Sequence, residues 1–199
     1  MVDGRVSAVR VWDRHIASVV SLVASPPVLI VAAMAIQAHA AYEPGVWSWV
    51  WLYAGLAVVL PLVYLVQLVW RGRVGDLHIE TREERFSPLG VMVISVGLAW
   101  FVFFLRGAPA PMTVLAGVLF VMSALIFAVT LFWKISVHCA SAGLVGILAG
   151  GLTGSAVPAV VTVSVMSWSR WRLNQHTPAQ AAAGTLLGVL ASVVVGALM

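Results

Sequence analysis

The chain contains little charge and almost no cysteine. Only 9% of its 199 residues are charged, whereas 62% are hydrophobic and the mean hydropathy is +1.04. This composition excludes an ordinary water-soluble domain and is typical of an integral membrane protein. The single cysteine, Cys139, excludes an intrachain disulfide and a multi-cysteine metal cluster. Redox chemistry is therefore not expected. The chain also lacks paired aspartates near helix ends, which metal-dependent prenyl and phosphatidyl transferases use.

Apolar segments fill most of the sequence. They cover residues 17–38, 46–70, 89–106, 111–133, 137–153, 155–169 and 179–199. Most of them approach the roughly 20 residues that a helix needs to cross a bilayer. Asp3 and Asp13 accompany the N-terminal arginines, and prolines interrupt the first segment, so we expect a retained first span rather than a cleaved signal. The sequence predicts an all-α, polytopic membrane bundle of six to seven transmembrane helices. We expect one integral membrane domain over residues 1–199, with a catalytic-motif region at about residues 71–199.

The fifth and sixth segments are short and rich in glycine. They meet at Thr153, Gly154 and Ser155, which predicts a tight helical hairpin. Small residues would let neighbouring helices approach closely, as packing in membranes favours. The alternative is that the glycines merely kink a lipid-facing helix. The residues concerned are Ala140, Gly143, Gly146, Gly150 and Gly151.

Basic residues are distributed unevenly. With seven spans, one side of the membrane receives the N-terminal tail, the 71–88 loop, the turn at Lys134 and the 170–177 turn. These segments hold ten of the eleven basic residues, and only Arg106 falls on the other side. The positive-inside rule then places the N-terminus and these loops in the cytoplasm, and we expect the plasma membrane as the location. The charge bias can also attract anionic lipid, so the bilayer is an expected partner and nucleic acid is not. A homo-oligomer is compatible with this arrangement.

Two polar clusters on this side of the membrane suit an anion. In the 71–88 loop, Arg82 and Arg85 are three residues apart and would project together, as paired guanidiniums that bind phosphate do. The alternative is a solvated loop whose glutamates neutralise these arginines. The second cluster places Lys134, Ser136 and His138 at alternate positions before a span, where they could bind an anion and donate a proton. Its alternative is a snorkelling lysine beside a structural histidine.

The third cluster lies between the last two segments. Arg170 ends one apolar segment, and His176 begins the next, with Gln180 four residues later on the same helical face. The Gln180 carboxamide oxygen could accept the imidazole N–H of His176 and fix which ring nitrogen faces a substrate. The alternative is a basic anchor followed by a helix start, because Pro178 fits a first helical turn.

The third cluster resembles a signature motif of the type 2 phosphatidic acid phosphatase superfamily, whose members are membrane lipid phosphatases related to vanadium haloperoxidases. That motif reads Ser-Arg-x5-His-x3-Asp. It matches here at Ser169, Arg170 and His176, while Gln180 stands where the family has Asp.

The other two clusters resemble the remaining motifs of this superfamily. The second motif, Pro-Ser-Gly-His, matches at Ser136 and His138, with Ile and Val in place of Pro and Gly. The first motif, which ends in Arg-x-x-Pro, matches loosely through Arg82, Arg85 and Pro88. The resemblance runs from residue 71 to the C-terminus.

The resemblance implies a metal-independent hydrolase that uses a covalent phosphohistidine, so we expect neither a metal nor another cofactor. The substrate would be a phosphomonoester or diphosphate of a lipid or a polyprenol. His176 would be the nucleophile, Gln180 would orient it, and His138 would protonate the leaving alkoxide. Such chemistry needs mainly in-line positioning and charge stabilisation. The residues implied to bind phosphate are Arg82, Arg85, Lys134, Ser136 and Arg170.

Two departures from the family pattern leave other functions open. Gln180 cannot give the charge of a carboxylate, so another acid such as Asp76 or Glu80 could be required. Two further apolar spans also separate the first motif from the second. The alternative is a catalytically weakened member that binds anionic lipid or acts as a membrane partner protein. A transporter or an intramembrane serine protease is disfavoured, because the stretch at residues 151–155 lies on the side opposite both histidines.

Overall fold

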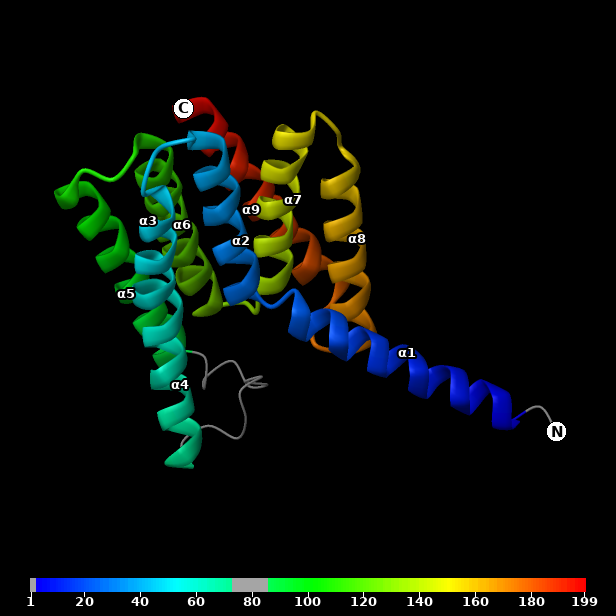
Figure 1. Ribbon diagram of the computed structural model, residues 1–199. Coiled ribbons are helices and arrows are strands. Elements are labelled where there is room, and N and C mark those ends of the chain that lie inside the picture. The colour runs from blue at the N-terminus through cyan, green and yellow to red at the C-terminus, as the bar shows by residue number, and fades with distance from the viewer. Residues whose placement is uncertain (1–2, 73–85) are drawn as a thin grey trace.

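The computed structural model describes the backbone of residues 3–72 and 86–199 and the side chains of residues 12–72 and 86–199. Every regular element within these ranges is a helix (Figure 1). The helices are α1 (Asp3–Val23), α2 (Pro26–Ala41), α3 (Val46–Tyr53), the π-helical η1 (Ala54–Val59), α4 (Leu60–Trp70), α5 (Phe86–Arg106), α6 (Ala110–Thr130), α7 (Val137–Thr153), α8 (Val157–Arg172) and α9 (Pro178–Leu198). This confirms an all-helical class.

Several helices are long and apolar enough to cross a membrane. They are Val46–Trp70, which joins α3, η1 and α4, together with α5, α6 and α9. A fifth candidate arises if α1 and α2 count as one broken span. Three other helices are shorter: α2 and α8 have 16 residues each, and α7 has 17. The chain is therefore a helical membrane protein with four to five candidate spans by length.

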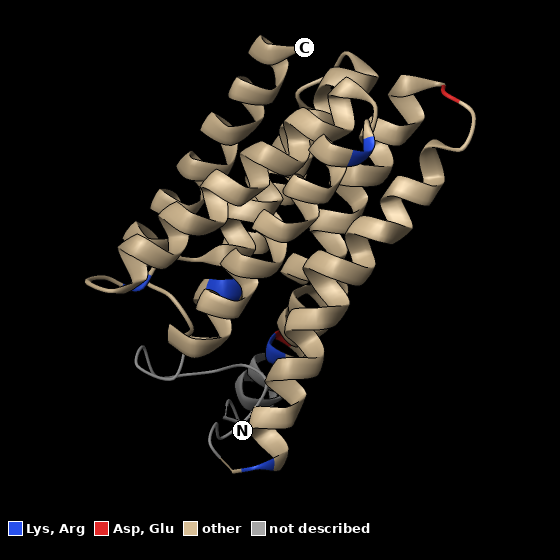
Figure 2. Cartoon of the chain, turned by 90° about the vertical axis from the view of Figure 1, so that its left-hand side faces the viewer, with Lys and Arg blue, Asp and Glu red and all other residues tan. Residues whose placement is uncertain are grey.

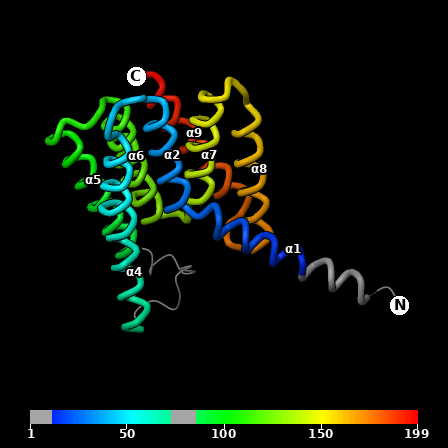
Figure 3. The backbone as a smooth tube through the Cα atoms, viewed as in Figure 1, coloured from blue at the N-terminus to red at the C-terminus, as the bar shows by residue number. Residues whose placement is uncertain are grey.

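The predicted first span, residues 17–38, is divided between two helices. α1 ends at Val23 and α2 begins at Pro26, and the two are bent by 48°. Ser25 adopts an extended conformation, and Pro26 and Pro27 occupy the first turn of α2, where the missing N–H of proline has no cost. α1 consequently leaves the bundle sideways at its lower end, as the tube in Figure 3 shows.

α7 and α8 form the predicted hairpin. Gly154 ends α7 with a φ of 64°, a conformation that glycine adopts without strain. A Cβ on Gly146 would lie 2.7 Å from the Cα of Ala159, so the two backbones are in close contact. Thr162 donates a hydrogen bond across this contact to the carbonyl oxygen of Ala142 at 3.2 Å. Close packing is thus confirmed at Gly146, whereas no described atom lies within 4 Å of a Cβ on Gly151.

α7 and α9 also touch through their backbones. A Cβ on Gly143 would lie 2.7 Å from the carbonyl oxygen of Thr185. In return, Gly184 faces the carbonyl oxygen of Ser136, and Gly188 faces that of Ala140. Glycines four residues apart allow this approach, as in other membrane helix pairs. The contact holds the start of α7 beside the start of α9.

One end of the bundle collects the positive charge. The α1–α2 junction, the α6–α7 loop and the α8–α9 turn all lie at the lower end in Figure 1. Figure 2 shows most of the described basic residues in the lower half of the molecule. Of the six lysines and arginines with described side chains, only Arg106 ends a helix at the opposite end. The other five are Arg14, Arg71, Lys134, Arg170 and Arg172.

Candidate functional site

The start of α9 fixes the geometry of His176. Thr177 caps the helix, and its Oγ1 accepts a hydrogen bond from the backbone N–H of Gln180 at 3.3 Å. The Gln180 Oε1 in turn accepts the backbone N–H of Thr177 at 3.1 Å. This reciprocal arrangement is a capping box.

The capping box also determines how the imidazole is protonated. The Gln180 atom that faces a backbone N–H must be the carboxamide oxygen, because that N–H can only donate. The same oxygen lies 3.3 Å from Nδ1 of His176, so Nδ1 is the donor of this pair. In the neutral ring, Nε2 then carries the lone pair. Gln180 thus contacts His176 as expected, but His176 lies just before the N-cap Thr177, so the contact is made through the capping turn and not along one face of α9.

Arg170 lies at the C-terminal end of α8, where the helix dipole favours a cation. Its side chain is only 2% exposed, and its Nη1 donates a hydrogen bond to Ser21 Oγ at 2.7 Å. The neighbouring Ser169 donates to the carbonyl oxygen of Ala17 at 2.7 Å. Two successive residues of α8 thus attach α1 to the bundle through hydrogen bonds.

Ser21 joins two of the sequence clusters, although sequence reasoning did not identify it. Its Oγ lies 3.4 Å from Nε2 of His138 as well as 2.7 Å from Nη1 of Arg170. One hydroxyl oxygen is therefore within hydrogen-bonding distance of both side chains. The sequence feature that could have identified Ser21 is its position as a small polar residue in an apolar run. Ser21 also follows Ala17 by four residues, so the two lie on the same helical face.

Ser136 connects the second cluster to the third through the backbone. Its N–H donates to the carbonyl oxygen of Gln180 at 3.3 Å. Its buried Oγ caps α7 by accepting the N–H of Cys139 at 3.3 Å. The same helix start supplies the partial positive charge of unsatisfied N–H groups. Lys134 precedes this cap by two residues and is half-buried.

The predicted site residues therefore divide into two groups. Ser136, His138, Arg170, His176 and Gln180 come together at one end of the bundle, with Ser21 added from α1 and Lys134 two residues before Ser136 in the chain. The other group lies outside the described residues and comprises Arg82, Arg85, Asp76 and Glu80. Among the side chains that the structure describes, no three of His, Cys, Asp or Glu are grouped to hold a metal ion.

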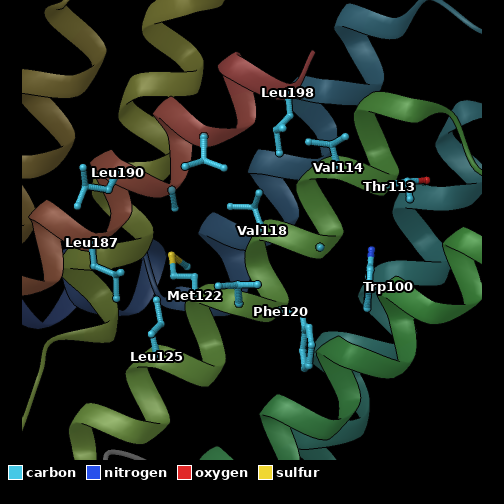
Figure 4. Close-up of a pocket in the computed structure, with 14 residues that line it drawn as sticks. Trp100, Thr113, Val114, Val118, Phe120, Met122, Leu125, Leu187, Leu190 and Leu198 are labelled. Atoms are coloured by element: carbon cyan, nitrogen blue, oxygen red, sulfur yellow. The ribbon is translucent and has the colours of Figure 1, made fainter.

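A separate cavity of about 600 Å³ lies between α5, α6 and α9 (Figure 4). Its lining is apolar apart from Thr113 and the indole of Trp100, and Leu187 of α9 faces it together with Leu125 of α6. None of the described site residues lines it. Leu187 follows Gln180 by seven residues, which corresponds to about 10 Å along the helix. This cavity thus presents an apolar surface close to the polar cluster.

Comparison of the chain with family models, with curated proteins and with solved structures finds no match.

Proposed function

We propose that this protein is a membrane lipid phosphatase that cleaves a phosphomonoester or diphosphate of a lipid or polyprenyl substrate through a phosphohistidine. The observation that supports the proposal most strongly is the meeting of two distant clusters. Ser21 bonds to both Arg170 and His138, and the backbone of Ser136 bonds to that of Gln180. A cation, two imidazoles and a helix N-terminus are then gathered at one end of a membrane bundle.

His176 is the proposed nucleophile. Because Gln180 engages Nδ1, the lone pair of Nε2 can attack phosphorus, and an N–P bond forms as the P–O bond to the lipid breaks. His138 gives its proton to the leaving alkoxide. Water then attacks the phosphohistidine, His138 takes up a proton from that water, and phosphate leaves. The neutral Gln180 orients the ring but adds no negative charge, so it supports an imidazolium less than a carboxylate would.

Cationic groups stabilise the transferred phosphoryl group in this proposal. Arg170 is the buried member, Lys134 and the start of α7 lie nearby in the chain, and Arg82 and Arg85 would complete the set. Planar guanidinium donors suit phosphate oxygens. Ser21 is a positioning residue, because it holds Arg170 and His138 side by side. The burial of Arg170 and His176 limits water at the reacting atoms and requires a local displacement when substrate enters.

A lipid is the substrate class that best fits the surroundings of the cluster. The polar residues lie at the end of an apolar bundle, so a phosphate could reach them while its hydrocarbon tail stays in the bilayer. The cavity between α5, α6 and α9 offers an apolar surface for such a tail.

We further propose seven crossings, with the site end in the cytoplasm and the protein in the plasma membrane. In this arrangement α2, α7 and α8 cross in addition to the four long helices. At about 24–26 Å, these three helices are shorter than the roughly 30 Å hydrocarbon core, so their polar ends would lie near the interface. The excess of basic residues at the site end supports the orientation.

A second candidate is an anionic-lipid-binding partner protein without turnover. The observation that favours it is Gln180, whose side chain is neutral where the resembled motif has an acid. Such a protein would keep the cationic cluster but release no phosphate.

Phosphate release from a panel of lipid phosphates, measured with purified protein in EDTA, separates the two candidates. If the protein is a phosphatase, the wild type releases phosphate and His176→Ala does not. His39→Ala serves as the control and should keep the activity, because His39 is exposed on α2. If wild type, Gln180→Asp and His176→Ala all release the same background amount, the catalytic proposal is wrong. Binding to anionic vesicles would then favour the second candidate.

A further inference from the structure

We propose that α1 lies in the membrane interface at the site end of the bundle and that its outer face is embedded in lipid. The first observation is an exposed apolar stripe along this helix. Trp12, Ile16, Val19 and Val23 repeat at intervals of four, three and four residues, which places them on one helical face. Each of these side chains is between 52% and 70% exposed.

The bundle uses a different face of α1. Asp13, Ala17 and Ser21 lie on the side that contacts α8. Arg172 pairs with Asp13 at 3.8 Å, which adds to the hydrogen bonds at Ala17 and Ser21. At 3.6 residues per turn, the apolar stripe points roughly 130° away from this contact face. The protein itself therefore leaves the stripe uncovered within its described part.

The exposed surface outside the stripe is polar except in the last turn, where Leu22 is exposed. Arg14, His15 and Ser18 are exposed and lie between the stripe and the contact face. A helix with one apolar and one polar exposed face is typical of segments that lie in the plane of a membrane interface. A span through the hydrocarbon core would instead be apolar around the exposed circumference.

Exposed tryptophans mark the site end of the bundle, where α1 is attached. Trp70, Trp133 and Trp171 are exposed at or just after the ends of α4, α6 and α8, all at the site end. Such residues form the aromatic belt at a membrane surface. Trp51 and Trp70 are 19 residues apart on one continuous helix, or about 28 Å, which matches the roughly 30 Å hydrocarbon core.

α1 is attached at this boundary. The bonds from Ser169 and Arg170 tie it to the last turn of α8, next to the exposed Trp171. The 48° bend before α2 turns it away from the bundle (Figure 3). Leu22 and Val28, on either side of the bend, are also exposed. A bilayer that surrounds the bundle therefore reaches the stripe, and this inference holds whether or not the site is catalytic.

Spin labels on single cysteines test the inference on the full chain in phosphatidylcholine–phosphatidylglycerol vesicles. Cysteine variants at Ile16 and Val19 are compared with variants at Arg14 and Ser18, all with Cys139→Ala. Labels at 16 and 19 should collide with oxygen several-fold more often, relative to a water-soluble nickel chelate, than labels at 14 and 18. Equal ratios at the four positions would show that α1 projects into water. Exclusion of both reagents at 16 and 19 would show that protein covers the stripe, and either result overturns the inference.

Tryptophan fluorescence tests the embedding of α1 in lipid without replacement of Cys139. Brominated lipids quench tryptophans that lie in the acyl region. The amount of emission that these lipids quench, per mole of protein, should be lower in Trp12→Phe than in wild type, because Trp12 is one of the lipid-exposed indoles. An equal amount of quenched emission in the two proteins would contradict the inference.

Discussion

Replacement of Gly188 by alanine should loosen the contact between α7 and α9. A Cβ at position 188 would overlap the carbonyl oxygen of Ala140 and lie 2.8 Å from its carbonyl carbon and 2.9 Å from the amide nitrogen of Leu144. These are backbone atoms that cannot rotate aside, so the helices must separate. Overpacking of this kind costs about 1–3 kcal/mol.

Gly196 provides a matched control on the same helix. No described atom lies within 4 Å of a Cβ there, so Gly196→Ala has only the helix-propensity gain of about 0.5–1 kcal/mol. Gly188→Ala shares that gain, and the two variants should therefore differ in free energy of unfolding by the overpacking cost of about 1–3 kcal/mol. Titration with sodium dodecyl sulfate in mixed micelles, followed by circular dichroism, measures the difference. Equal midpoints for the two variants would refute the backbone contact between α7 and α9.

Other predictions concern the site. Ser21→Ala removes the acceptor of the buried Arg170 Nη1 and should lower the free energy of unfolding by about 1–3 kcal/mol. In Ser21→Ala, phosphate release should also fall about tenfold, equivalent to about 1.4 kcal/mol. Replacement of the exposed Ser18 by alanine should change neither the stability nor the rate of phosphate release. Thr177→Ala removes the cap of α9 and should destabilise the protein by about 1 kcal/mol in the same titration, with recovery in Thr177→Ser; no loss would contradict the capping role. Gln180→Asp should speed phosphoenzyme formation in rapid-quench assays, and Gln180→Leu should slow it; equal rates would exclude a role in orienting the ring.

The fold was predictable where the sequence pattern is local. Long apolar runs indicated the helices, and the short glycine-rich pair indicated the α7–α8 hairpin. The break before Pro26 was visible as a proline pair, but its geometric effect was not, because a proline pair can kink a span or end it. Whether the shorter helices cross the membrane stays a prediction, since length alone does not settle it.

The candidate site was predictable only for residues close in the sequence. The spacing of four residues predicted that Gln180 contacts His176, but the contact is made through the capping turn before α9 and not along one helical face. The contribution of Ser21 could not be read in the same way, because it depends on how α1 packs against α8, some 150 residues later in the chain. The glycine contacts that set Ser136 beside Gln180 are also tertiary. The proposed roles of Arg82 and Arg85 stay predictions, as they lie outside the described residues.

Trapping of a labelled phosphoryl group on the protein tests the central proposal most directly. The purified chain is mixed briefly with a lipid phosphate labelled with radioactive phosphorus, quenched and separated from lipid. We expect label on the wild-type chain, longer-lived label on His138→Ala and none on His176→Ala. The same amount of label on His176→Ala as on wild type, or none on wild type and His138→Ala, would contradict a phosphohistidine at His176.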